Sequence, residues 1–164
     1  MDVSDVLADA FGRVRDVVHA SVDELTEDEL LVRLDPDANS IAWLAWHLTR
    51  VQDDHVAGAF GVEEVWPKWR DRFGMTGDPI GYGDTTEQVA RVRADAELLT
   101  AYHDAVYQQT IDLVSGVSDD DLARIVDERW DPPVTLSVRL VSVISDCLQH
   151  AGQAMFVRGI IDRR

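Results

Sequence analysis

The chain has one cysteine, Cys147, among its 164 residues. An internal disulfide is therefore excluded, and this cysteine usage fits a reducing compartment. Apolar runs are also short, because none approaches the roughly 20 residues that a membrane-spanning helix needs. The first residues, MDVSDVLADAF, are acidic, whereas an export signal is basic and then apolar. We therefore expect a soluble, cytoplasmic protein that does not bind membranes.

Basic side chains are scarce, and Lys68 is the only lysine. The chain has 31 acidic and 15 basic side chains, which give a formal net charge of −16 at pH 7. A surface of this charge repels the phosphates of nucleic acids, so we expect no nucleic-acid partner. The chain is long enough to bury one proper core and short for two, which predicts a single domain over residues 1–164.

Apolar residues recur at three- and four-residue spacing along most of the chain, which is typical of helices that bury one face. The pattern predicts long helices over residues 3–22, from 41 towards 60, over 86–114 with a break near Asp95, and over 136–161. Residues 61–84 lose the pattern and collect glycine and proline, which predicts a long connection. The segment DERWDPPVT is predicted to be extended.

Asp146 and His150 lie four residues apart in the last predicted helix. At 3.6 residues per turn they share one face, so they can hold the same ion or the same proton. His47, on the second predicted helix, is the best candidate for a third ligand. Two imidazoles and a carboxylate make an open-sided divalent metal site. In the alternative interpretation, Asp146 faces solvent or pairs with Arg139 or Arg158.

The remaining histidines have weaker patterns. His55 is eight residues after His47 and about 80° around the helix, so the two cannot easily share an ion. We expect a structural or supporting role for His55, and either a pocket position or a packed one for His103. Cys147 is expected to be a small buried side chain. Trp43, Arg50, Tyr102 and His103 are candidates for substrate contact, with burial in the core or exposure on the surface as the alternatives.

The stretches SIAWLAWHLTRVQDDHV and ERWDPPVTLSVRLVSVISDCLQHAGQ, with the order of helices, resemble the DinB-like superfamily. The resemblance covers nearly the whole chain and is nearest to the branch of mycothiol-dependent maleylpyruvate isomerase domains. It implies an all-α, four-helix bundle with a long crossover between the second and third helices. It also implies metal ligands at His47, Asp146 and His150. The isomerase branch typically has glutamate where this chain has the shorter Asp146.

The resemblance implies a metal-dependent thiol S-transferase or isomerase-like enzyme that uses a low-molecular-weight thiol such as mycothiol. Zinc is the favoured metal because thiols are soft ligands, while the carboxylate keeps nickel, iron and manganese open. The expected partners are a small-molecule thiol and an electrophile, with a possible homodimer. The alternatives are a metal-dependent hydrolase and a non-catalytic scaffold or stress-associated binding protein, since fold membership does not confer activity.

Overall fold

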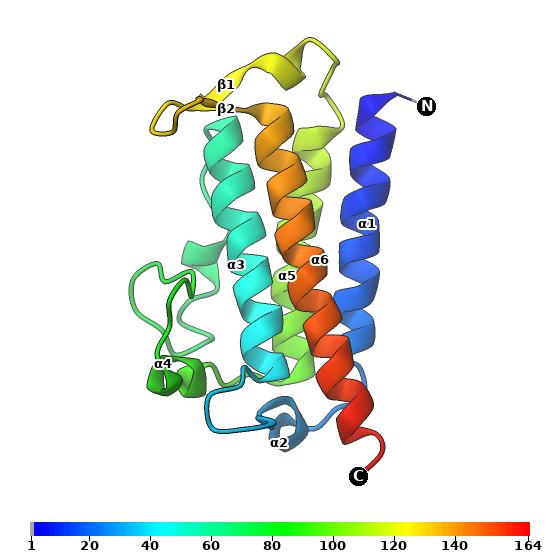
Figure 1. The fold of residues 1–164 in the computed structure, drawn as a ribbon, viewed down its shortest axis with the longest axis vertical. Coiled ribbons are helices and arrows are strands. Elements are labelled where there is room, and N and C mark those ends of the chain that lie inside the picture. Colours follow the sequence, from blue (N-terminus) through cyan, green and yellow to red (C-terminus); the bar gives the residue numbers. More distant parts are fainter. Residues whose placement is uncertain (1) are drawn as a thin grey trace.

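Four long helices form the body of the computed structural model, which describes residues 2–164 (Figure 1). They are α1, α3, α5 and α6, with the bounds Val3–Val22, Ile41–Phe60, Ala96–Val114 and Leu136–Ile161. Helices α1 and α3 each pack against both α5 and α6. The predicted all-α fold is confirmed, as is the break before α5. No helix in the described part of the chain is long and apolar enough to cross a membrane.

Polar side chains fix the points at which the long helices begin. Asp2, Ser40, Asp95 and Thr135 each accept a hydrogen bond from a backbone N–H in the first turn of the helix that follows. Such caps satisfy amide groups that have no partner within the helix. Every long helix therefore has a start that is encoded locally in the sequence.

Shorter elements connect the long helices. Helix α2 (Glu27–Leu30) follows α1, and the crossover between α3 and α5 contains a 3₁₀ turn (Trp66–Lys68) and α4 (Thr86–Arg91). A second 3₁₀ turn (Asp121–Ala123) precedes strands β1 (Ile125–Asp127) and β2 (Val134–Thr135). The segment predicted to be extended thus forms an antiparallel hairpin, which lies across one end of the bundle near α3 and α6 (Figure 1).

Helix α3 is buried on every side over residues 41–53. The crossover covers the side of α3 that α5 and α6 leave open, and Figure 1 shows it running beside this helix. Polar residues of α3 that a simple amphipathic pattern would place in solvent are therefore buried. Arg50 and Asp53 are 0% and 2% exposed.

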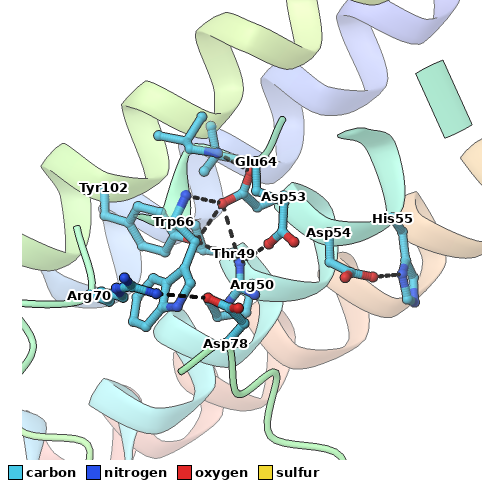
Figure 2. A network of polar contacts seen from close by, with 12 residues as sticks. Thr49, Arg50, Asp53, Asp54, His55, Glu64, Trp66, Arg70, Asp78 and Tyr102 are labelled. Carbon is cyan, nitrogen blue, oxygen red and sulfur yellow. Dashed lines mark hydrogen bonds and ion pairs between the residues drawn. The ribbon is translucent and has the colours of Figure 1, made fainter. Parts of the chain in front are cut away.

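Asp53 attaches the crossover to α3 (Figure 2). Its carboxylate accepts hydrogen bonds of 2.8 Å from the backbone amides of Val65 and Trp66 and from the hydroxyl of Tyr102 on α5. Arg50 lies 3.3 Å from the same carboxylate. These bonds satisfy buried polar groups that would otherwise be costly, and they join three separate parts of the chain.

Arg50 holds a later part of the crossover. Its guanidinium donates to the carbonyl oxygen of Pro79 at 2.9 Å and to the carboxylate of Glu64 at 2.7 Å. It also lies over the ring of Trp66, 4.7 Å from the ring centroid. Arg50 and Tyr102, two candidates for substrate contact, are buried in this network. They position the crossover.

Candidate metal centre

His47 on α3 meets Asp146 and His150 on α6. One potential ligand atom from each side chain lies within 4.8 Å of those of the other two. His47 is buried, and the other two residues are half-buried. The structure therefore brings together all three residues named from the sequence, at the contact between α3 and α6. Their role as metal ligands stays a prediction.

His47 is held in one protonation arrangement by the crossover. Its Nδ1 lies 2.5 Å from the carbonyl oxygen of Ile80. Because a carbonyl oxygen only accepts, Nδ1 carries the hydrogen and the lone pair of Nε2 stays available. The ring of Trp43 stacks on the imidazole with centroids 4.5 Å apart. Burial lowers the pKa of His47, so the neutral form that a metal requires is favoured near pH 7.

The crossover reaches His47 only because residue 81 is glycine. Gly81 has a φ of +105°, and a Cβ there would lie 2.7 Å from His47 Nδ1. The same Cβ would lie 3.1 Å from ring carbons of Trp43 and Trp46. A side chain at this position would therefore push the carbonyl of Ile80 away from the imidazole.

His150 is oriented from within its own helix. Its Nδ1 lies 2.9 Å from the amide oxygen of Gln153, which can only accept. In the neutral ring the second nitrogen, Nε2, is then the one without a hydrogen, and it lies 3.7 Å from Oδ1 of Asp146. The ring centroids of His47 and His150 are 4.8 Å apart. Both imidazoles are thus held in the tautomer that leaves Nε2 free to bind a metal.

Asp146 has a buried oxygen without a partner. Its Oδ2 is inaccessible to solvent and receives no hydrogen bond from residues 2–164. The alternative pairings with arginine are wrong. Arg139 donates to Asp127 at 2.9 Å, and Arg158 donates to two backbone carbonyl oxygens at the end of α1. A carboxylate oxygen buried without a donor is costly unless a positive group meets it.

The donor set fits a divalent transition metal. Two neutral imidazole nitrogens and one carboxylate oxygen are common ligands of zinc and related ions, and three protein ligands leave positions open for other molecules. The partnerless Oδ2 of Asp146 supports this fit, because a cation would satisfy it. Bound metal would keep a net positive charge, since only one of the three ligands is anionic.

Tyr82, which no pattern in the sequence singles out, borders the cluster from the crossover. The ring centroids of Tyr82 and His47 are 5.3 Å apart and the rings are nearly perpendicular, while 59% of Tyr82 is exposed. Desolvation, followed by the nearby charge of Asp146, raises the pKa of Tyr82 to about 12, so the phenol stays neutral. The only signal in the sequence is an aromatic residue between Gly81 and Gly83. That signal does not show which way the connection folds.

His55 of α3 lies on the side of Tyr82 away from His47. Its Nδ1 is 2.6 Å from Oδ2 of Asp54, and its Nε2 is 3.2 Å from the hydroxyl of Tyr82. The hydrogen bond from His55 lowers the pKa of Asp54, which is therefore ionised. Figure 2 shows this pair pointing away from the Arg50 network. His55 thus supports Tyr82 and is not a fourth member of the cluster.

Two further residues with side chains that can take part in chemistry, His103 and Cys147, lie outside the cluster. His103 is fully buried, its Nδ1 is 2.9 Å from Thr49 Oγ1, and burial lowers its pKa to about 3. Cys147 is also fully buried, and its thiol donates to the carbonyl oxygen of Leu48 at 3.4 Å. Burial raises the pKa of Cys147 well above its ordinary value, so it stays an unreactive thiol. The packed alternative for His103 and the predicted burial of Cys147 are confirmed.

The fold and the cluster define a class of protein: an all-α bundle with two histidines and a carboxylate between two of its helices. Comparison with known families and structures identifies the class more closely. Residues 6–163 match the mycothiol-S-transferase family, and the chain belongs to that family. A crystal structure of a conserved protein from Enterococcus faecalis superposes with a TM-score of 0.90 at 27% sequence identity. The match covers 100% of this chain and 99% of the Enterococcus faecalis chain, and the shared fold is DinB-like. No curated protein matches the sequence.

Proposed function

We propose that this protein is a divalent-metal-dependent S-transferase that joins a low-molecular-weight thiol, such as mycothiol, to an electrophile. The observation that carries the proposal is the convergence of ligand atoms from His47, Asp146 and His150 within 4.8 Å. Membership in the mycothiol-S-transferase family supports the thiol as co-substrate. Zinc is the metal we favour, because it accepts imidazole, carboxylate and sulfur ligands.

The protein has no sulfur nucleophile of its own. Cys147 is its only cysteine and is buried as a neutral thiol. A sulfur nucleophile must therefore come from a second molecule, which agrees with a free thiol as co-substrate. A mechanism in which the protein itself becomes covalently attached to the electrophile through cysteine is excluded for the same reason.

The residues of the site have separate tasks in this proposal. A divalent ion bound there would lower the pKa of a thiol and favour its thiolate, which is the nucleophilic form. His47 and His150 supply neutral nitrogen ligands whose tautomers are fixed by Ile80 and Gln153. Asp146 supplies the single negative charge. The rings of Trp43 and Tyr82 pack beside His47 and limit the movement of its imidazole.

Metal binding is tested first, by thermal unfolding of metal-depleted protein with and without zinc or nickel. At metal concentrations about 100 times the Kd, we expect the melting temperature to rise by roughly 5–10 °C. His47→Ala, Asp146→Asn and His150→Ala should each remove most of this rise. His19→Ala is the matched control, because His19 pairs with Asp104 outside the cluster. The metal site is refuted if the wild type shows no shift, or if all three variants keep it.

Turnover is tested next, by following loss of the thiol in mixtures with a panel of electrophiles. Metal-loaded wild-type protein should consume mycothiol, and the three cluster variants should not. Hydrolysis of an ester or amide without any thiol would instead support the hydrolase. Metal binding with neither reaction would support a scaffold.

A further inference from the structure

A second polar site lies beside the cluster. A cleft of about 390 Å³ opens where the end of α3, the β hairpin and the start of α6 meet. Its polar lining consists of Asp54, His55, Asp127, Glu128, Arg129 and Arg139. None of these residues belongs to the cluster or to the buried Arg50 network. The function of the cluster alone does not account for them.

The cleft and the cluster lie along the same pair of helices. His55 follows His47 by eight residues, which is about 12 Å along α3, and Arg139 precedes Asp146 by seven, about 10 Å along α6. A separation of seven residues is close to two full turns, so Arg139 and Asp146 share a face. Tyr82 joins the two sites, because its hydroxyl is 3.2 Å from His55 and its ring meets that of His47.

The charges in the cleft nearly balance. Asp127 is 7% exposed and receives two hydrogen bonds of 2.9 Å from Arg129 and one of 2.9 Å from Arg139. Glu128 has no hydrogen bond or ion pair with any of residues 2–164. The cleft therefore offers three carboxylates, two guanidinium groups and an imidazole. A strongly charged ligand would need a clear excess of the opposite charge, which is absent from this lining.

Hydroxyl groups suit such a lining. Each hydroxyl both donates and accepts, so a polyol can donate to Asp54 and Glu128 while it accepts from a guanidinium group. Hydrogen bonds to charged groups are stronger than those between neutral groups, and the carboxylate of Asp127 orients the guanidinium groups of Arg129 and Arg139. The separation of roughly 10–12 Å from the cluster lets one small molecule reach both sites.

We infer that the cleft binds the polyhydroxylated, sugar-like part of the thiol co-substrate, while the sulfur end reaches His47, Asp146 and His150. This inference rests on the proposed function. It adds a selectivity site, because a thiol without hydroxyl groups would reach the cluster and leave the cleft empty. Glu128 and Arg129 are the residues to replace, since both are exposed, and Asp127 keeps Arg139 as a donor when Arg129 is changed.

Binding is measured by calorimetry with N-acetylglucosaminyl-inositol, a thiol-free analogue of mycothiol whose nitrogen is acylated and uncharged, as it is in the thiol. Wild-type protein and His47→Ala should bind it equally well, whereas Glu128→Gln and Arg129→Gln should each weaken binding about tenfold. Glu63→Gln and Arg13→Gln are matched controls, because both residues are exposed and lie outside the cleft. No binding by the wild type, or equal binding by the cleft variants, overturns the inference.

Kinetics separate this inference from the proposed function. In Glu128→Gln and Arg129→Gln, KM for mycothiol should rise about tenfold, while kcat/KM for N-acetylcysteine stays unchanged. Equal losses with both thiols would overturn the inference, because they would indicate a general structural effect. Failure of the proposed function would look different: no thiol would be consumed, yet the glycoside would still bind in a manner that depends on Glu128 and Arg129.

Discussion

Gly81 couples the path of the crossover to the orientation of one imidazole. Its φ of +105° is disfavoured for other residues, and a Cβ there would meet His47 Nδ1 at 2.7 Å. Gly83 has a φ of +71° and nothing within 4 Å of such a Cβ. An added side chain at either glycine would strain the backbone, but only at Gly81 would it also clash with a neighbouring side chain. Comparing the two positions therefore separates the free energy of the clash from that of the backbone strain.

We predict that Gly81→Ala destabilises the protein by about 1–3 kcal/mol more than Gly83→Ala does, since both add backbone strain and only the first adds a clash. Chemical denaturation measures this difference. Gly81→Ala should also reduce the melting-temperature rise caused by zinc, because the Ile80 carbonyl would move away from His47. Similar stability losses for both variants would show that residue 81 has room for a methyl group.

His103 makes stability depend on pH. Burial lowers its pKa from an ordinary 6.5 to about 3, so the unfolded chain binds a proton at pH 5 that the folded protein does not. The contribution of His103 is thus complete above pH 6.5 and is lost as pH falls towards 3.

Between pH 7 and pH 5, the wild type should lose about 2 kcal/mol more stability than His103→Gln. Glutamine keeps a hydrogen-bonding group near Thr49 but does not titrate. Urea unfolding at the two pH values measures the free energies. The same pH dependence in both proteins would mean that other groups cause the acid sensitivity.

Asp53 links three elements, because its carboxylate bonds the crossover, Tyr102 of α5 and Arg50 of its own helix. Asp53→Asn would leave the buried guanidinium without its nearest negative partner on α3. We expect a loss of about 3–5 kcal/mol in urea unfolding, with faster hydrogen exchange at the amides of Val65 and Trp66. Asp9→Asn, at an exposed ion pair with Arg13, should change stability little. A similarly small effect at Asp53 would contradict the role of the network.

The long helices could be predicted because their information is local. Apolar spacing and caps lie within each segment, and the structure has α1 and α6 at the predicted bounds. The path of the crossover could not be predicted in this way. It depends on Arg50 and Asp53, which the pattern of α3 would place in solvent and which only the folded crossover buries.

The residues of the candidate site also differ in whether the sequence predicts them, depending on whether they lie on a helix or in a connection. Asp146 and His150 follow from a spacing of four residues on one helix, and His47 follows from the packing of two amphipathic helices. Tyr82 lies in a glycine-rich connection, and Glu128 lies in a hairpin loop, so neither has a periodic pattern to show its direction. Sequence reasoning therefore finds the cluster residues, which lie on helices, and misses the residues that surround them.

The whole chain of 164 residues has a formal net charge of −16, but the cluster and the cleft do not share this strong excess of negative charge. The cluster has one carboxylate and two imidazoles, and the cleft has two arginines and three carboxylates. An anionic surface opposes the approach of polyanions. Small ligands with little net charge meet less of this opposition, which agrees with a hydroxyl-rich thiol.

The bond from His47 to Ile80 makes the tautomer of an imidazole on α3 depend on a distant part of the chain. Helices α3 and α6 alone bring the cluster residues near one another, but without the Ile80 carbonyl the imidazole of His47 has two interchangeable tautomers. The crossover that carries this carbonyl is itself attached to α3 and α5 through Asp53 and Tyr102. A substitution that detaches the crossover would therefore free the His47 ring without touching the cluster.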